Sequence, residues 1–483
     1  MVFNSFPFVV FFIIVFLVYW YPLKEKTNLQ NFFLLVASWF FYGYANWKIL
    51  PLLIVSILIF YFLGKAISKH KADKTGSWLT TLGVVLGIGA LVYFKYFNFF
   101  IESFAALFNS LGLQTNLHTF NIILPLGISF YTFRLLSYII DIHRGKGEAT
   151  NDFVAFATYI SFFPCLLSGP IDRPKFIAQL QKTRTFSYAF AVDGSRQILW
   201  GLFKKMVIAD NIATYVDAVW GNMDARGGST FVLAAILYLF QIYADFSGYS
   251  DMAIGVGKLL GFKIADNFKA PLFALNIADY WRRWHITLTQ WLTDYVFMPL
   301  NIKFRDLGNG GIILAILINF VLIGMWHGAD WTFALFGLYH GLLYIPLILS
   351  GAFFKKTKLQ TNKLGLPVLK DFGRIILTMF LVVVGLILFR ADNMGQAIDY
   401  TQHIFQTSLF SMPWLYASNW YPTVFISIIL LIVLEWLTRK EEHPLTLFAG
   451  KPIALQVVVY YALVIAIYFL HPQAEMTFIY FQF

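Results

Sequence analysis

The sequence DYWRRWHITLTQWLTDYVFMPLNIKFRDLGNGGIILAILINFVLIGMWHGADWTFALFGLYHG, residues 279–341, is the stretch around which the rest of the chain can be interpreted. It contains two Trp-His pairs, which end at His285 and His327, and the second pair follows an apolar run over residues 312–325. Hydrocarbon penalises polar groups, so an imidazole at the end of a membrane segment indicates a functional site. The alternative for each histidine is a hydrogen bond to a neighbouring helix or a place at the headgroup level. Two such pairs joined by one apolar segment favour the functional interpretation.

The composition indicates the class of protein. Of the 483 residues, 59% are hydrophobic and only 13% are charged, which is about half the charged fraction of a soluble domain. The apolar residues form long blocks, so we predict an all-α polytopic membrane protein. The Lys and Arg residues behind the net charge of +11 lie in short loops beside those blocks. This placement indicates contact with anionic membrane lipid rather than with nucleic acid.

Apolar segments predicted to lie in the membrane follow one another along the chain. They cover residues 6–20, 29–45, 50–63, 78–96, 231–243, 312–325, 331–349, 375–389, 424–437 and 455–470. Lysine-rich loops are expected in the cytoplasm, and this places both termini outside it. The first apolar segment is predicted to be a membrane helix rather than a cleaved signal peptide. Because no soluble domain is recognisable, residues 1–483 are predicted to form a single transmembrane domain.

The region over residues 97–193 has an irregular pattern. One apolar piece has Pro125 near its start and Arg134 in its middle, and a second piece, residues 159–176, is broken by three prolines and a glycine. Backbone of this kind survives at membrane depth only where protein or water satisfies its amides. We therefore predict half-spanning or re-entrant segments that line a cavity. The single cysteine, Cys165, excludes an internal disulfide and suits a small apolar position better than an acylation site.

Two stretches before the Trp-His pairs have a clear pattern of their own. Residues 196–208 predict a basic amphipathic helix at the cytoplasmic interface, and this helix contains Lys204 and Lys205. Small residues around Gly248 predict that two helices approach each other closely.

Four residues near the Trp-His pairs have two interpretations each. Asp330 follows His327 by three residues, so it either shares a helix face with that histidine or caps a helix. Arg282 and Arg283 either bind the phosphates of a cofactor or mark the cytoplasmic boundary. His340, within an apolar helix, is more often a packed core histidine. The sequence contains no glycine-rich phosphate loop, no Cys/His cluster and no GxSxG elbow, so no metal is expected.

Five segments of the chain resemble the membrane-bound O-acyltransferase (MBOAT) superfamily. They are LPLGISFYTFRLLSYIIDIHRG, SFFPCLLSGPIDRPKFIAQL, YADFSGYSDMAIGVGKLLGF, NFKAPLFALNIADYWRRWHITLTQWLTDYVFMPL and MWHGADWTFALFGLYHG. Within the superfamily they look like the membrane subunit of bacterial alginate O-acetyltransferase and its peptidoglycan and polysaccharide O-acetylation relatives. The likeness covers nearly the whole chain, including FRADNMGQAI and the terminal FIYFQF.

The resemblance implies a bundle of tilted, broken and re-entrant helices around a central tunnel, where donor and acceptor meet from opposite sides. The catalytic histidine of the family's WHG motif falls on His327, and the second family histidine falls on His285. Histidine titrates near neutral pH and serves as a base for a hydroxyl or stabilises an oxyanion. Our further candidates to line the tunnel are Trp284, Trp326, Asp330 and His340.

The resemblance also implies an activity. We expect an O-acyltransferase of the bacterial cytoplasmic membrane that moves acetyl from cytoplasmic acetyl-CoA to an extracytoplasmic acceptor, through a partner acetyltransferase of the SGNH type. Acetyl-CoA is then a substrate rather than a tightly bound cofactor, and the candidates to hold its phosphates are Arg282, Arg283, Lys204 and Lys205. One alternative is D-alanyl transfer from a carrier protein towards teichoic acid. A proton-coupled transporter that uses the two histidines and a structural scaffold belong to other classes.

Overall fold

The computed structural model describes all residues except 114–118, 121, 356, 416–419, 473–475 and 480–483. The described residues form helices and loops, with one isolated bridge between Thr361 and Pro367. Eight helical segments within this part of the chain are long and apolar enough to cross a membrane. They are Trp47–Lys69, Lys74–Ser110, Gly228–Leu259, Asn309–His327, Trp331–Leu349, Leu369–Arg390, Trp420–Leu437 and Ile453–Leu470. The predicted all-α polytopic membrane fold is confirmed.

Contacts within the chain divide it into two compact units. The first contains Met1–Gly194 and Val256–Ala265, and the second contains Ser195–Gly255 and Asp266–Phe483. The prediction of a single domain over residues 1–483 stays a prediction.

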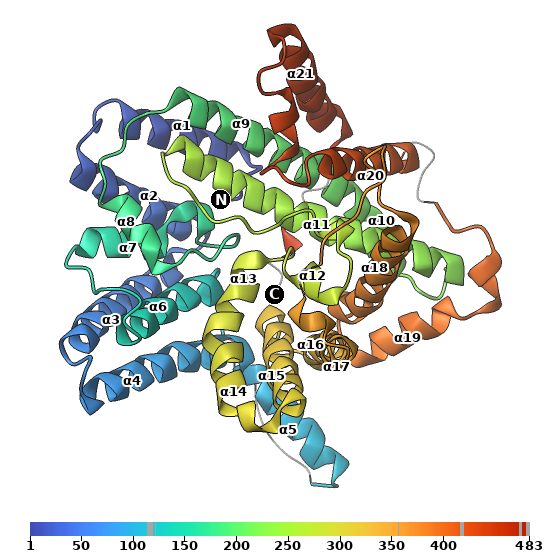
Figure 1. Ribbon diagram of the computed structural model, residues 1–483, viewed down its shortest axis with the longest axis horizontal. Helices are drawn as coiled ribbons and strands as arrows, with labels where there is room; N and C mark the ends of the chain where they lie inside the picture. The colour runs from blue at the N-terminus through green and yellow to red at the C-terminus, as the bar shows by residue number, and fades with distance from the viewer. Residues whose placement is uncertain (114–118, 121, 356, 416–419, 473–475, 480–483) are drawn as a thin grey trace. The chain divides into compact units, whose positions relative to one another are not determined.

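The first unit is built from short and medium helices. They are α1 (Phe6–Trp20), α2 (Thr27–Ala45), α3 (Leu50–Lys69), α4 (Lys74–Leu91), α5 (Phe97–Ser110), α6 (Ile128–His143), α7 (Phe153–Ser161), α8 (Ile177–Leu180) and the start of α9 (Tyr188–Phe203). In this unit α3, α4 and α6 pack on one another, and α2 packs on α7 (Figure 1). Helix α1 has the predicted bounds because Ser5 caps it and Pro7 lies in its first turn. Its 15 residues rise about 22 Å, less than the thickness of a hydrocarbon core.

Arg134 satisfies the backbone of the broken piece that follows α7. This side chain is 1% exposed, and its guanidinium donates to the carbonyl oxygens of Tyr159, Ile160, Cys165 and Pro170 at 2.6–3.4 Å. Helix α7 ends before a proline, and its last carbonyls would otherwise lack donors. The predicted interruption is confirmed, and a protein side chain satisfies the backbone carbonyls there.

The second unit contains the end of α9, most of α11 (Gly228–Leu259) and the stretch with the Trp-His pairs. Its other helices are α10 (Asp210–Trp220), α12 (Ile277–Trp281), α13 (Ile286–Leu292), α14 (Met298–Lys303), α15 (Asn309–His327), α16 (Trp331–Leu342), α17 (Ile345–Leu349), α18 (Leu369–Arg390), α19 (Met394–Ile404), α20 (Trp420–Leu437) and α21 (Ile453–Leu470). A π-helical turn, η5 (Lys204–Ala209), joins α9 to α10.

Glycines allow helices of the second unit to touch through their backbones at two places. A Cβ atom on Gly201 of α9 would lie 2.6 Å from the carbonyl oxygen of Gly248 in α11, which confirms the close approach predicted there. A Cβ on Gly337 of α16 would collide with the carbonyl oxygen of Phe320 in α15. Helices α15 and α16 therefore lie side by side at backbone contact (Figure 1). This contact fixes the two helices that precede and follow the motif Trp326-His327-Gly328.

The residues predicted to form a basic amphipathic helix are helical, in the end of α9 and the turn η5, but the two lysines do not lie at an interface. Lys204 and Lys205 are 3% and 1% exposed, and the turn η5 that contains them is buried within the second unit. The interfacial placement was wrong because it was based on charge, whereas carboxylates of the same unit neutralise both lysines.

We expect Gly337→Ala to destabilise the protein, because the added methyl group meets the main chain of Phe320 and forces α15 and α16 apart. Overpacking of this kind costs about 1–3 kcal/mol. The measurement is the melting temperature of the detergent-purified protein. Gly373→Ala is the matched control, since a Cβ at that α18 position meets nothing within 4 Å. Equal melting temperatures of the two variants would contradict the importance of this contact.

Candidate active site

Helix α15 ends at His327, inside the protein. Gly328 follows in an extended conformation with φ −157° and ψ 159°, and α16 starts three residues later. The His327 side chain is buried, and its imidazole lies edge-on to the rings of Trp326 and Phe389, with centroids 5.0 Å away in both cases. The break between α15 and α16 thus places an imidazole among aromatic rings.

His327 lines a narrow internal space, which we call the histidine cavity. Its volume is about 10 Å³, close to the smallest space that holds one water molecule. Apart from His327 and His340, its walls are aromatic or aliphatic, and they include Tyr280, Trp281, Trp284, Phe336 and Phe389. Two imidazoles therefore line one small, mostly apolar space.

His340 reaches the histidine cavity from the next helix, α16. Trp281 Nε1 donates to His340 Nδ1 at 3.3 Å, and because an indole nitrogen only donates, that imidazole nitrogen must carry a lone pair. The other nitrogen, Nε2, has no hydrogen-bond partner among the described residues. His340 is a packed core histidine, as its position in an apolar helix indicated, and it also shares a cavity with His327.

The indole of Trp326 contacts both histidines of the Trp-His pairs. Its centroid is 5.5 Å from that of His285 and 5.0 Å from that of His327. The sequence separates these imidazoles by 42 residues, and the fold brings both against one ring. His285 is fully buried and is not among the residues that line the histidine cavity. His327 lines the histidine cavity and His285 does not, so our expectation that the two imidazoles line one cavity stays a prediction.

Asn267 fixes the orientation of His285. The backbone of His285 is left-handed, with φ 44°, a conformation that costs a non-glycine residue on the order of 1–3 kcal/mol. The Asn267 carbonyl oxygen accepts from the backbone N–H of Ile286 at 2.9 Å, and its Oδ1 accepts from Thr287 Oγ1 at 2.8 Å. His285 Nδ1 lies 3.1 Å from the same Oδ1. As Oδ1 is an acceptor, Nδ1 donates, and Nε2 is left as the basic nitrogen.

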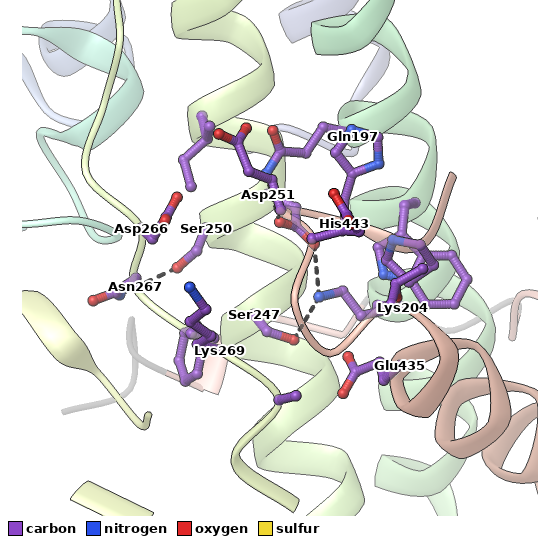
Figure 2. A pocket seen from close by; sticks show the side chains of 18 of the residues that line it. Gln197, Lys204, Ser247, Ser250, Asp251, Asp266, Asn267, Lys269, Glu435 and His443 are labelled. Carbon is purple, nitrogen blue, oxygen red and sulfur yellow. Dashed lines mark hydrogen bonds and ion pairs between the residues drawn. The ribbon is translucent and has the colours of Figure 1, made fainter. Parts of the chain in front are cut away.

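Asn267 also lines a second space, which we call the lysine pocket (Figure 2). Its volume is about 50 Å³. Lys204 extends into the pocket, where its Nζ lies 2.7 Å from Asp251 Oδ2 and 2.8 Å from Ser247 Oγ. Asn267 Nδ2 donates to Ser250 Oγ at 3.2 Å on the same wall. Asn267 therefore connects a charged pocket to His285.

The loop after α20 forms another wall of the lysine pocket. It contributes Arg439, Glu441, Glu442 and His443. Glu435, near the end of α20, accepts from the Tyr243 hydroxyl at 2.6 Å.

A third and larger space lies beyond Phe389, and we call it the aspartate chamber. Its volume is about 370 Å³, and Phe389 lines both this chamber and the histidine cavity. Charged side chains of α10, α11 and the end of α18 form its polar walls, together with Lys205 and residues near the C-terminus. One aromatic ring therefore separates the chamber from His327.

Asp330 caps a helix, and it does not share a helix face with His327. Its Oδ1 accepts from the backbone N–H of Thr332 at 2.8 Å at the start of α16. The shared-face interpretation was wrong because the extended Gly328 ends α15 before Asp330 is reached. Among the residues predicted to line a tunnel, His340 and Trp284 line the histidine cavity, and Trp326 contacts both His285 and His327.

The basic residues predicted to hold phosphates differ in their surroundings. Arg283 Nε lies 3.1 Å from Asp279 Oδ1, while Arg282 is about half exposed and donates to Thr357 Oγ1 at 3.3 Å. Lys204 and Lys205 are buried against carboxylates, so neither ammonium group can contact an external phosphate without leaving its partner. Arg282 is the most accessible of these four candidates.

Sequence reasoning did not identify Asn267, Trp281 or Phe389. Asn267 contacts residues 17–20 positions away, and Phe389 meets His327 from another helix. No local spacing predicts such contacts. The one available signal was an asparagine beside an aspartate in a mostly apolar region.

The sequence is similar to one known protein family and to several named proteins. The profile of the membrane-bound O-acyltransferase family matches residues 39–390. A probable alginate O-acetylase of Azotobacter vinelandii is 36% identical over 403 residues, which cover 82% of this chain and 76% of that protein. A peptidoglycan O-acetyltransferase of Helicobacter pylori is 33% identical, over 76% of this chain and 72% of its own length. A teichoic acid D-alanyltransferase of Bacillus subtilis is 33% identical over 46% of this chain and 58% of its own.

We expect Asn267→Ala to lower turnover by on the order of 10²-fold, because His285 loses the acceptor that fixes its tautomer and orientation. Asn267→Asp keeps an oxygen acceptor and should retain more activity than the alanine variant. Acetyl transfer by purified protein is the measurement, and Asn309→Ala, at an exposed position of α15, is the control. Equal activities of the alanine and aspartate variants would show that the hydrogen bond to His285 does not matter.

Proposed function

This chain belongs to the membrane-bound O-acyltransferase family and is an O-acyltransferase, and on that premise we propose that it acetylates a cell-envelope polysaccharide. The acetyl group comes from cytoplasmic acetyl-CoA and goes to an acceptor on the outer side of a bacterial cytoplasmic membrane. The observation that carries the proposal is the position of His327, at the wall of a nearly dry cavity that one ring separates from a polar chamber.

The predicted topology places the lysine pocket and the aspartate chamber on opposite sides of the membrane. Arg439 and His443 of the lysine pocket lie on a basic loop that the charge pattern assigns to the cytoplasm. Ala391 and Asp392 of the aspartate chamber begin a region without Lys or Arg, which the same pattern assigns to the outside. Both termini are then extracytoplasmic. On this topology the lysine pocket lies on the donor's side of the membrane and the aspartate chamber on the acceptor's side.

The chemistry follows from the histidines. The acceptor hydroxyl gives its proton to His327 as its oxygen attacks the thioester carbonyl. The carbon–sulfur bond then breaks, and the leaving thiolate takes the proton back from the imidazolium. The products are an acetyl ester and free coenzyme A thiol. His285, held through Asn267, supports the same site by orienting the acyl donor, because its Nε2 can accept a hydrogen bond from an amide N–H of the donor's pantetheine arm.

The donor needs only part of its length at the site. Its nucleotide is highly charged and enters hydrocarbon at great cost, so the pantetheine arm and thioester extend inward. Arg282, partly exposed beside Thr357, is the candidate to hold phosphate at the surface.

A partner protein completes the pathway. The aspartate chamber, at about 370 Å³, is near the lower end of the volumes that hold a drug-sized ligand. It therefore suits one small hydroxyl-bearing group better than a long polymer. An extracytoplasmic acetyltransferase of the SGNH type then transfers the acetyl group to the polysaccharide.

D-alanyl transfer towards teichoic acid is the second candidate. The similarity to a teichoic acid D-alanyltransferase supports it, over 46% of this chain. The similarity to the two O-acetylation proteins covers 76–82% of the chain and favours acetyl as the transferred group.

We expect His327→Ala to lower acetyl transfer by about 10²- to 10⁴-fold, the usual contribution of a positioned base. The measurement is acetylation of the envelope by cells whose variant accumulates normally in the membrane. His70→Ala, at a partly exposed position on the first unit, is the control. Near-normal acetylation with the His327 variant would refute the assignment.

Sidedness is tested in vesicles that contain the purified protein. With acetyl-CoA on the cytoplasmic face alone, acetyl should appear on an acceptor confined to the opposite face. Transfer only when both substrates share one face would contradict the path through the membrane, although the acyltransferase activity itself would stand.

A further inference from the structure

The charged groups of the aspartate chamber form two clusters of the same kind. Lys205 Nζ lies 2.8 Å from Asp210 Oδ1 and 2.7 Å from Asp245 Oδ1. Arg390, in the second cluster, lies 2.8 Å from Asp217 Oδ1 and 3.8 Å from Asp392 Oδ1. Each cation thus faces two carboxylates, and all six side chains line the chamber.

The chamber consequently has an excess of negative charge. Four carboxylates against two cations give a formal charge of −2. Burial raises the pKa of Asp210 to about 7, against the opposing effect of Lys205, so protonation of that residue still leaves −1. Both cations are already engaged, and neither is available to an incoming anion.

An uncharged group capable of hydrogen bonding also lines the chamber. Gln241 of α11 is 6% exposed, and its Oε1 has no hydrogen-bond partner among the described residues. The next residue, Ile242, lines the histidine cavity. A hydroxyl bound at Gln241 is therefore one residue along α11 from the wall of that cavity, and Phe389 is the ring shared by the two spaces.

We propose that the aspartate chamber binds an uncharged hydroxyl compound and excludes anionic ones, so that the immediate acetyl acceptor carries no carboxylate beside its hydroxyl. That the bound compound accepts the acetyl group rests on the proposed function, whereas the selection by charge does not. A carboxylate-bearing sugar would enter a space that is already negative. The cluster around Lys205 is buried and little screened by solvent, whereas Asp217 and Asp392 are half or more exposed and act from the mouth of the chamber. An anionic polysaccharide then receives its acetyl group in a later step, from a neutral hydroxyl carrier.

The charge selection is tested by the reactivity of a cysteine in the chamber wall. Met476 lines the chamber and is partly exposed, so Met476→Cys is combined with Cys165→Ala and treated with a cationic or an anionic methanethiosulfonate. Relative to a small free thiol, the cationic reagent should react faster by on the order of 10-fold. Gln406→Cys, at an exposed position outside the chamber, should show a much weaker preference.

Removal of the charges should remove the preference. Asp392→Asn and Asp217→Asn, combined with Met476→Cys, should bring the ratio of the two rates towards that of the control cysteine. Equal reactivity with both reagents in the parent protein, or an unchanged ratio in these variants, would overturn the proposal.

Acetyl transfer supplies an independent measurement. Methyl glucoside and methyl glucuronide, at equal concentration with acetyl-CoA, should be acetylated at rates that differ by on the order of 10-fold in favour of the glucoside. Faster transfer to the glucuronide would overturn the proposal. If neither is acetylated while the cysteine shows its charge preference, the failure belongs to the proposed function and the charge selection stands.

Discussion

Polar backbone groups at helix ends inside a membrane must find partners within the protein, and the architecture of this chain depends on that constraint. Helix α15 ends at His327 and α16 begins at Trp331. The helix therefore breaks where hydrocarbon offers no hydrogen-bond partner to the backbone amides and carbonyls. The Asp330 carboxylate caps the start of α16 and makes the break tolerable. Arg134 does the same for the broken piece of the first unit, through four carbonyl oxygens. A continuous helix would need neither a cap such as Asp330 nor a donor such as Arg134.

The same constraint explains the buried lysines. Lys204 and Lys205 are successive residues of the π-helical turn η5, and each has carboxylate partners within 2.8 Å. Lys204 lines the lysine pocket and Lys205 lines the aspartate chamber. A buried ion pair adds little net stability, but loss of one partner leaves a charge whose burial is very costly. One turn thus places a neutralised charge in the wall of each polar space, and π-helical turns of this kind are frequent at functional sites.

The sequence predicted the parts of this fold that depend on local pattern. The bounds of α1, the interruption after α7 and the close approach at Gly248 follow from capping, proline and small residues. It did not predict that α11 continues past Tyr243, because Asp245 and Asp251 look unsuited to a membrane helix until their lysine partners are known. Those partners lie at least 40 residues away, so no spacing rule links them.

In the candidate site, too, some residues were identifiable from the sequence and others were not. His285 and His327 were identifiable because a polar residue beside a long apolar run is costly to keep. The hydrogen bond of Asn267 to His285 and the position of Phe389 are tertiary contacts, and the sequence contains no signal for either. The predicted phosphate role of Lys204 and Lys205 was based on charge alone. Charge does not distinguish a lysine that binds ligand from one that a carboxylate already holds, and only burial and distance separate the two cases.

The small volume of the histidine cavity has a chemical consequence. A space of about 10 Å³ cannot hold a thioester and a hydroxyl together, so the substrates must displace the surrounding rings as they enter. In the reaction proposed above, Phe389, which lines both the cavity and the aspartate chamber, is the ring that the acceptor would displace. While that ring remains in place, His327 meets at most about one water molecule. Exclusion of bulk water protects a thioester from hydrolysis until an acceptor arrives. In the proposed reaction, the aromatic packing around His327 serves catalysis as well as the fold, because a site closed to bulk water favours transfer to a hydroxyl over hydrolysis.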